Sequence, residues 1–207
     1  MQVDVKQLFA YPIAIINLED TFDNFFKKET NAQVYFENKH EHCFNNFSSK
    51  SVNVLEGYEN EKNKLLECVN FYKNEIMKWG NSDFRITTSW LTKTEQYGFS
   101  KSHSHYNSVI SGVLYSGLNG FKDVGNIVFT SPKQHSSILP CLPSEYTFDN
   151  CTEAWIPALS NHLILFESSL KHHIGKHNSI QPRTSLAFNT FPTGNCGIND
   201  SSVYLGI

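Results

Sequence analysis

Hydrophobic and polar positions in the first part of the chain predict one long helix. Between residues 58 and 79, apolar side chains recur at spacings near 3.6, with charged residues between them, and Gly80 follows. This pattern is typical of an amphipathic helix that ends at a glycine and packs on the outside of a sheet. The rest of this part predicts a strand, a short helix and an irregular polar segment, at residues 8–17, 18–30 and 31–51.

The second part of the chain predicts short strands separated by turns. Clusters of Gly, Pro, Asn and Ser divide it into apolar or alternating runs. We predict strands at residues 84–94, 108–115, 125–130, 154–156, 162–167 and 184–191, and a surface loop or lid at 131–151. Helices followed by many short strands predict an α+β fold with an antiparallel barrel or sandwich of the jelly-roll or cupin type.

Length and composition narrow the class of protein. With 207 residues, 40% hydrophobic and 18% charged, we expect one soluble globular domain spanning residues 1–207, with a supporting part (about 1–82) and a barrel core (about 83–192). The net charge of -3 gives no indication of a nucleic-acid partner. Five scattered cysteines, no signal-peptide pattern and no apolar run of about 20 residues predict a cytoplasmic protein without a membrane partner.

Histidines supply the candidate metal ligands. His103 and His105 are one residue apart, just before the strand predicted at residues 108–115, and in an extended chain their side chains share one face. Two imidazoles on one face are suited to bind one metal ion together with a distant third ligand. The pair His172–His173, after an apolar strand and a polar turn, offers that ligand. The remaining histidines, His40, His42, His135, His162 and His177, are expected in loops or at the surface.

A strand near the end of the chain predicts a polar cavity. Along it, Arg183, Ser185, Ala187 and Asn189 share one face, and apolar side chains occupy most of the other. The guanidinium of Arg183 has no charged neighbour in sequence, and its planar fork matches a carboxylate bidentately.

Several of these pieces, taken in order, resemble the 2-oxoglutarate/Fe(II) oxygenases found widely in phages and marine bacteria. The resemblance covers about residues 84–191 and rests on Trp90, Gly98, His103-Ser104-His105, Ser111-Gly112-Val113-Leu114-Tyr115, 125–129, Leu165-Phe166, His172 and 182–189. It implies a double-stranded β-helix with supporting N-terminal helices, and a cytoplasmic location in a host if the gene is a phage gene. It also implies that His103, His105 and His172 bind Fe(II) and that Arg183 receives the distal carboxylate of the cosubstrate 2-oxoglutarate.

This chain departs from the wider superfamily in one ligand motif, and the resemblance leaves alternative functions open. The wider superfamily has His-x-Asp or His-x-Glu where this chain has His103-Ser104-His105, so the site lacks one negative charge. The leading expectation is a dioxygenase, a hydroxylase of unknown substrate, that uses 2-oxoglutarate and O2. The alternatives are a cupin-like metal- or ligand-binding protein without redox catalysis and a three-histidine dioxygenase that does not use 2-oxoglutarate.

Supporting residues are expected around this site. Tyr115 is a candidate hydroxyl donor to 2-oxoglutarate, and further candidates are Asn107, Ser111, Ser185 and Asn189, whereas Trp90 is expected in the core. Substrate specificity is expected in residues 31–51 and 131–151, since loops carry specificity on such folds.

Overall fold

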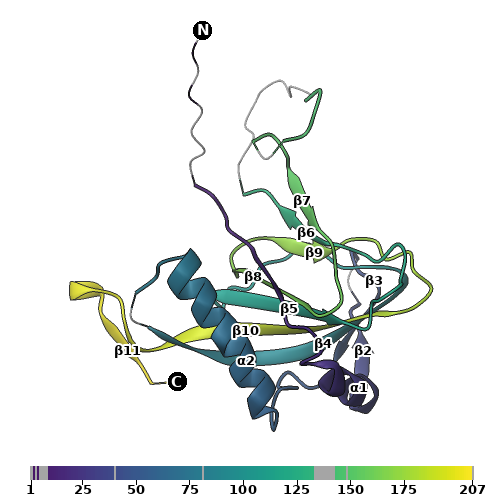
Figure 1. Cartoon of the computed structure of the whole chain (residues 1–207), viewed down its shortest axis with the longest axis horizontal. Helices are drawn as coiled ribbons and strands as arrows, with labels where there is room; N and C mark the ends of the chain where they lie inside the picture. The colour runs from purple at the N-terminus through teal and green to yellow at the C-terminus, as the bar shows by residue number, and fades with distance from the viewer. Residues whose placement is uncertain are drawn as a thin grey trace.

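Two antiparallel sheets face each other in the part of the chain that the computed structural model describes, residues 2, 4, 9–39, 41–80, 82–132, 143–147 and 149–206 (Figure 1). The larger sheet has strand order β1-β8-β5-β10-β4-β3-β2, with β11 paired to β10, and the smaller has order β7-β6-β9. The larger sheet consists of β1 (Ala14–Asn17), β2 (Tyr35–Glu37), β3 (Phe44–Ser49), β4 (Asp83–Phe99), β5 (Ile110–Ser116), β8 (His162–Glu167), β10 (Arg183–Cys196) and β11 (Val203–Leu205). The smaller consists of β6 (Ile127–Thr130), β7 (Glu153–Ile156) and β9 (His172–Ile174).

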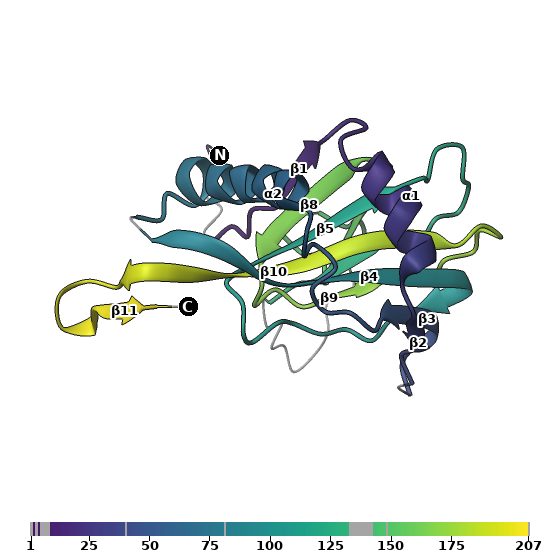
Figure 2. The same cartoon turned by 90° about the horizontal axis from the view of Figure 1, so that it is seen from below.

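Helices cover the outer face of the larger sheet. Helix α1 spans Asp23–Ala32, and α2 spans Glu59–Phe71 and continues as a π-helical turn over Tyr72–Ile76. Both lie on the same side of the sheet (Figures 1 and 2). A 3-10 turn, Asn199–Ser201, precedes β11 in the hairpin that projects from the end of β10 (Figure 2).

The buried face of α2 follows the apolar periodicity of the sequence. Leu65, Val69 and Tyr72 are fully buried in a cluster that also contains Leu91 of β4 and Leu186 of β10. These spacings of three and four residues place the side chains on one helical face. The helix therefore packs on the sheet as the sequence predicted, between residues 58 and 79.

Close packing between β5 and its neighbours requires a glycine. A Cβ atom on Gly112 would lie 2.3 Å from Cζ of Phe188 and 2.9 Å from Cδ2 of Leu165. The aromatic ring of Phe188 thus fills the space above the backbone of β5. Any side chain at Gly112 would force this part of the core apart.

The second cluster of buried residues lies between the two sheets. Its members from the larger sheet include Val113, Tyr115, Ile164 and Phe166, and those from the smaller include Ile127 and Phe129. This packing fills part of the space between the sheets and leaves a pocket beside it.

Most predicted strands are present, and the differences have local causes. β8 has the predicted bounds, and β4, β5, β6, β7 and β10 overlap their predictions. The segment 31–51, predicted to be irregular, contains β2 and β3. Its strands are rich in polar residues, whose hydrogen bonds only the folded sheet supplies: Asn46 Nδ2 donates to Thr94 Oγ1 at 3.0 Å. β9 and β11 have three residues each, too few for a periodic signal.

Candidate functional site

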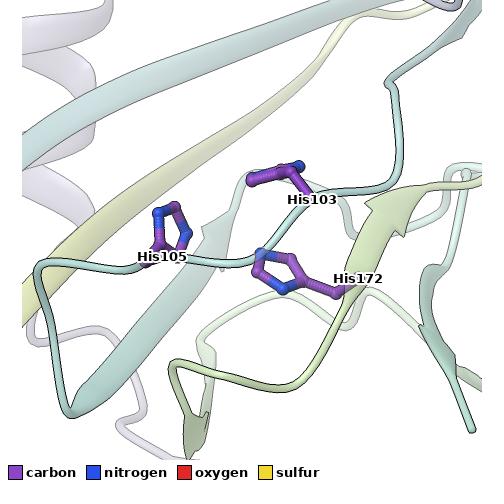
Figure 3. Close-up of side chains that lie close together, drawn as sticks. All are labelled: His103, His105 and His172. Atoms are coloured by element: carbon purple, nitrogen blue, oxygen red, sulfur yellow. The ribbon is translucent and has the colours of Figure 1, made fainter. Parts of the chain in front are cut away.

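Three histidine side chains meet between the sheets. His103 and His105 come from the segment between β4 and β5, and His172 begins β9 (Figure 3). Their ring centroids are 4.5 Å (His103–His172), 5.1 Å (His103–His105) and 5.2 Å (His105–His172) apart. One nitrogen from each ring lies within 4.8 Å of the others. This spacing allows three imidazoles to bind one metal ion on one side and leave its other positions open.

Backbone pairing holds these histidines together. His103 N donates to His172 O at 3.0 Å, His172 N donates to His103 O at 2.8 Å, and His105 N donates to Ser168 O at 2.9 Å. The two histidines precede β5, which starts at Ile110 rather than at the predicted residue 108, and His103 forms an isolated bridge with His172. Bonds to His172 and to Ser168 therefore hold this segment where the rings meet.

Hydrogen bonds orient two of the rings. His103 Nδ1 lies 3.0 Å from Lys101 O, and His172 Nδ1 lies 2.9 Å from Leu170 O. A carbonyl oxygen only accepts, so each Nδ1 carries the proton and donates it. Each Nε2 therefore keeps a lone pair for a metal ion, an arrangement typical of metal-binding histidines.

Burial keeps two of the rings neutral. Burial, with a smaller contribution from the neighbouring His103, lowers the pKa of His172 to about 3 and that of His105 to about 4. Only the neutral imidazole binds a metal ion, so these two rings are in the binding form at neutral pH.

The guanidinium of Arg183 is buried and largely unpaired. Arg183 is 1% exposed, and its Nη2 donates to the Tyr115 hydroxyl at 2.8 Å. Cζ of Arg183 lies 4.6 Å from the centroid of the Tyr115 ring. Nε and Nη1 are also buried, and neither has a hydrogen-bond partner among the described residues. Because an unpaired buried charge is costly, this geometry favours an anion at Nε and Nη1.

The Tyr115 hydroxyl is suited to the same anion. Burial raises its pKa, while the Arg183 charge and hydrogen bond act in the opposite direction. The oxygen accepts a hydrogen bond from Arg183 and keeps its own proton to donate.

Arg183, Tyr115 and the three histidines line one pocket of about 440 Å³. Ser185 and Ser111 line it too, as predicted for polar residues near the site. No Asp or Glu lines the pocket in the described part of the chain. The residues therefore fit both a divalent metal ion and an organic anion, and leave each without a protein carboxylate beside it.

Two other predicted residues lie elsewhere. Asn189 is not at the pocket wall; it is buried behind Ser111, whose Oγ donates to Asn189 Oδ1 at 2.8 Å. It lies at the irregularity between β10 and β4, at Asn189/Thr190. Asn107 is exposed in the turn before β5 and does not line the pocket.

Sequence reasoning missed one wall of the pocket. Trp90, expected in the core, is half-exposed and lines the pocket, with its ring centroid 5.8 Å from that of His105. Asn38, Asn46 and Ser48, from the segment 31–51, line the same wall. The alternation of Trp90 and Thr92 with the buried Leu91 was the available signal. Of the second predicted specificity segment, 131–151, most of the residues lie outside the described part of the chain.

The other histidines take different positions. His177, expected at the surface or in a loop, is fully buried: its Nδ1 accepts from Gly125 N at 3.2 Å and its Nε2 lies 2.7 Å from Gln181 O. Burial lowers its pKa, and the charge of Arg183 lowers it further. His40 and His135 lie outside the described residues.

Comparison with solved structures identifies the fold. The chain is similar to an oxidoreductase of the 2OG-Fe(II) oxygenase family from Burkholderia pseudomallei (TM-score 0.57, 12% identity, 86% of this chain and 84% of that one). It is also similar to a Pseudomonas putida prolyl-4-hydroxylase (0.55, 12%, 86% and 92%) and to HygX from Streptomyces hygroscopicus with nickel, 2-oxoglutarate and hygromycin B bound (0.61, 12%, 88% and 84%). The fold is thus the α+β double-stranded β-helix of 2-oxoglutarate oxygenases, which confirms the predicted fold class.

The sequence itself matches a family. Residues 88–189 match the family described as putative 2OG-Fe(II) oxygenase, which confirms the resemblance drawn from the motifs. No curated protein matches the chain. Among the described helices, none is long and apolar enough to cross a bilayer.

Proposed function

We propose that this protein is a non-haem Fe(II)- and 2-oxoglutarate-dependent dioxygenase that hydroxylates its substrate. The observation that carries the proposal is the buried, unpaired guanidinium of Arg183 in the same pocket as three convergent imidazoles. A ligand that has a carboxylate at one end and a metal-chelating group at the other satisfies both features. The dianion 2-oxoglutarate is such a ligand, and the family match supports the choice.

In this proposal His103, His105 and His172 hold Fe(II) through their Nε2 atoms. Lys101 O and Leu170 O accept the Nδ1 protons, and so fix the orientation of two rings before the metal binds. When bound, Fe(II) supplies the chemistry in which O2 oxidises 2-oxoglutarate to succinate and CO2 and the second oxygen atom enters a substrate C–H bond.

Arg183 binds the distal carboxylate through its unpaired Nε and Nη1. Tyr115 keeps Arg183 in place by accepting from Nη2, and donates its hydroxyl proton to the same carboxylate. Ser185, two residues along the same face of β10, offers a further hydroxyl. Because both Arg183 and Tyr115 are buried, the carboxylate binds in a place from which water is excluded, which strengthens these interactions.

The set of three neutral ligands favours a second candidate, a three-histidine dioxygenase that does not use 2-oxoglutarate. Without a carboxylate ligand the metal keeps its full double charge, which alters its redox potential and its selectivity among divalent metals. A cupin-like protein that binds a metal without redox catalysis has the same ligands. Arg183 distinguishes these readings, because neither alternative requires an anion at that position.

Anaerobic titration of Fe(II) and 2-oxoglutarate tests the proposal. We expect a weak visible charge-transfer band that requires both components, because the oxo acid chelates an open Fe(II) site. His172→Ala and Arg183→Met should each abolish the band, and the exposed Arg85→Met should keep it. Metal binding without the band would favour the alternatives, and absence of metal binding would refute the site. Succinate formed with a substrate would then establish turnover.

A further inference from the structure

The side chains of one wall of the pocket have no role in holding the metal or the oxo acid. This outer wall consists of Trp90 on β4, Asn46 and Ser48 on β3, Asn38 just after β2, and Lys101 at the exposed rim. The centroid of the Trp90 ring lies 5.8 Å from that of the His105 ring, so the outer wall is beside the metal site. A group bound at the outer wall would thus lie next to the reacting centre.

The outer wall stays accessible when the oxo acid is bound. Arg183 of β10 pairs with Thr94 of β4, and Thr94 pairs with Asn46 of β3. Neighbouring strands lie about 4.8 Å apart, so β3 is roughly 10 Å from β10. A 2-oxo acid that reaches from the metal to Arg183 therefore lies over β10 and leaves β3 and β4 for a second molecule.

The charges of the pocket select against cations. Lys101 and Arg183 are the charged side chains that line it, and no carboxylate does so in the described part of the chain. Arg183 is committed to the oxo acid, while Lys101 makes no ion pair with any described residue. A cationic substrate finds no counter-ion here, whereas an anionic group finds Lys101.

The polar groups of the outer wall are pre-ordered and have bonding capacity left. Asn38 Nδ2 donates to Asn46 Oδ1 at 2.6 Å and to Ser48 Oγ at 3.0 Å, and Asn46 Nδ2 donates to Thr94 Oγ1. The Asn38 carbonyl oxygen and the second proton of the Asn46 amide are not used in these bonds. These unused groups, an acceptor on Asn38 and a donor on Asn46, are of the kinds that bond to the edge of a heterocyclic base, and a half-exposed indole matches its flat face.

We propose that the outer wall binds the primary substrate and that this substrate is a nucleotide. The base stacks on Trp90, its edge bonds to Asn38 and Asn46, and the phosphate pairs with Lys101. This inference rests on the proposed oxygenase function, because it takes the metal and Arg183 as the site of the cosubstrate. It concerns a small molecule, because the chain's net charge of -3 gives no indication of a nucleic-acid partner.

Binding to the Mn(II)- and 2-oxoglutarate-loaded protein tests the inference. The probes are AMP, CMP, GMP and UMP, their nucleosides, and hygromycin B as a cation, measured by calorimetry and tryptophan fluorescence. We expect at least one nucleotide to bind and to quench Trp90, and hygromycin B not to bind. Trp90→Leu should weaken the best nucleotide at least about fivefold, and Trp155→Phe, on exposed β7, should leave its affinity unchanged.

Lys101→Gln provides an independent test at an exposed residue. It should weaken the nucleotide about tenfold and leave the matching nucleoside unchanged, since a hydrogen bond to a charged group is lost only for the former. Binding of hygromycin B, binding insensitive to both variants, or no nucleotide binding while 2-oxoglutarate still binds would overturn the inference alone. Failure of 2-oxoglutarate to bind, measured separately through its dependence on Arg183, would overturn the proposed function and this inference with it.

Discussion

The cost of the buried guanidinium can be measured directly by replacing Arg183 with methionine. The substitution removes a charge that is 1% exposed and has one protein hydrogen bond, to Tyr115. Exchanging a buried ionic group for an apolar side chain of similar volume is neutral or stabilising by ~1–4 kcal/mol. Leaving the Tyr115 hydroxyl without its partner costs ~1–3 kcal/mol. Together these contributions place the variant, without 2-oxoglutarate, between ~3 kcal/mol less stable and ~3 kcal/mol more stable than the wild type.

With 2-oxoglutarate the difference in stability should shift in favour of the wild type. A ligand at 100 times its Kd stabilises the folded wild type by ~2.7 kcal/mol, and the variant lacks the anion site and gains nothing. For a chain of this size each kcal/mol changes Tm by about 2–4 °C, so the wild type should gain roughly 5–11 °C. Thermal unfolding of both proteins in Mn(II), with and without 2-oxoglutarate, measures the change in Tm that the ligand causes in each.

A matched control is available in the other arginine of the chain. Arg85 is exposed on β4, and Arg85→Met should change neither Tm nor the response to 2-oxoglutarate. An Arg183→Met variant that is more than ~3 kcal/mol less stable than the wild type without 2-oxoglutarate would show that the guanidinium already has a counter-ion. That result would refute the reasoning that assigns an anion to this position.

Three further predictions concern the site and the core. His172→Ala should reduce the amount of bound metal to background, whereas His173→Ala should not. Mass spectrometry after dialysis measures the bound metal, and an equal loss in both variants would refute the assignment of His172 as a ligand. His177 is buried with its pKa lowered, and unfolded imidazole titrates near ~6.5, so the unfolded state binds the proton first as the pH falls. As the pH falls below about 6.5, the free energy of unfolding should therefore decrease less steeply in His177→Gln than in the wild type. Urea titrations at several pH values measure this dependence, and equal slopes of free energy against pH in the two proteins would contradict the prediction. Gly112→Ala should lower that free energy by ~1–3 kcal/mol because the new methyl group overlaps a core ring, whereas Gly80→Ala, with nothing within 4 Å, should change it by less than ~0.5 kcal/mol.

The local sequence pattern was sufficient to predict an element where its apolar and polar residues alternate with the period of that element. Helix α2 buries one face, and strand β10 has apolar side chains on one face and mostly polar ones on the other, so period 3.6 and period 2 appear in their residues and predict both elements and their apolar faces. The polar face of β10, with Arg183 and Ser185, was assigned to a cavity on this basis, and both residues line the pocket. The polar strand β3 gave no such signal, because its side chains bond to β4 and to Asn38 rather than entering an apolar core.

The sequence by itself determined the α+β class, the buried faces of the main helix and strands, and the residue types that bind a metal and a carboxylate. These features depend on the order of neighbouring residues, which periodicity and spacing record. Only the tertiary structure decided that His103 pairs with His172, that two nitrogens of Arg183 have no hydrogen-bond partner among the described residues, and that Trp90 lines the pocket rather than the core. Each of these depends on which strands become neighbours, and on what fills the space between the sheets, and neither is a property of any single stretch of chain.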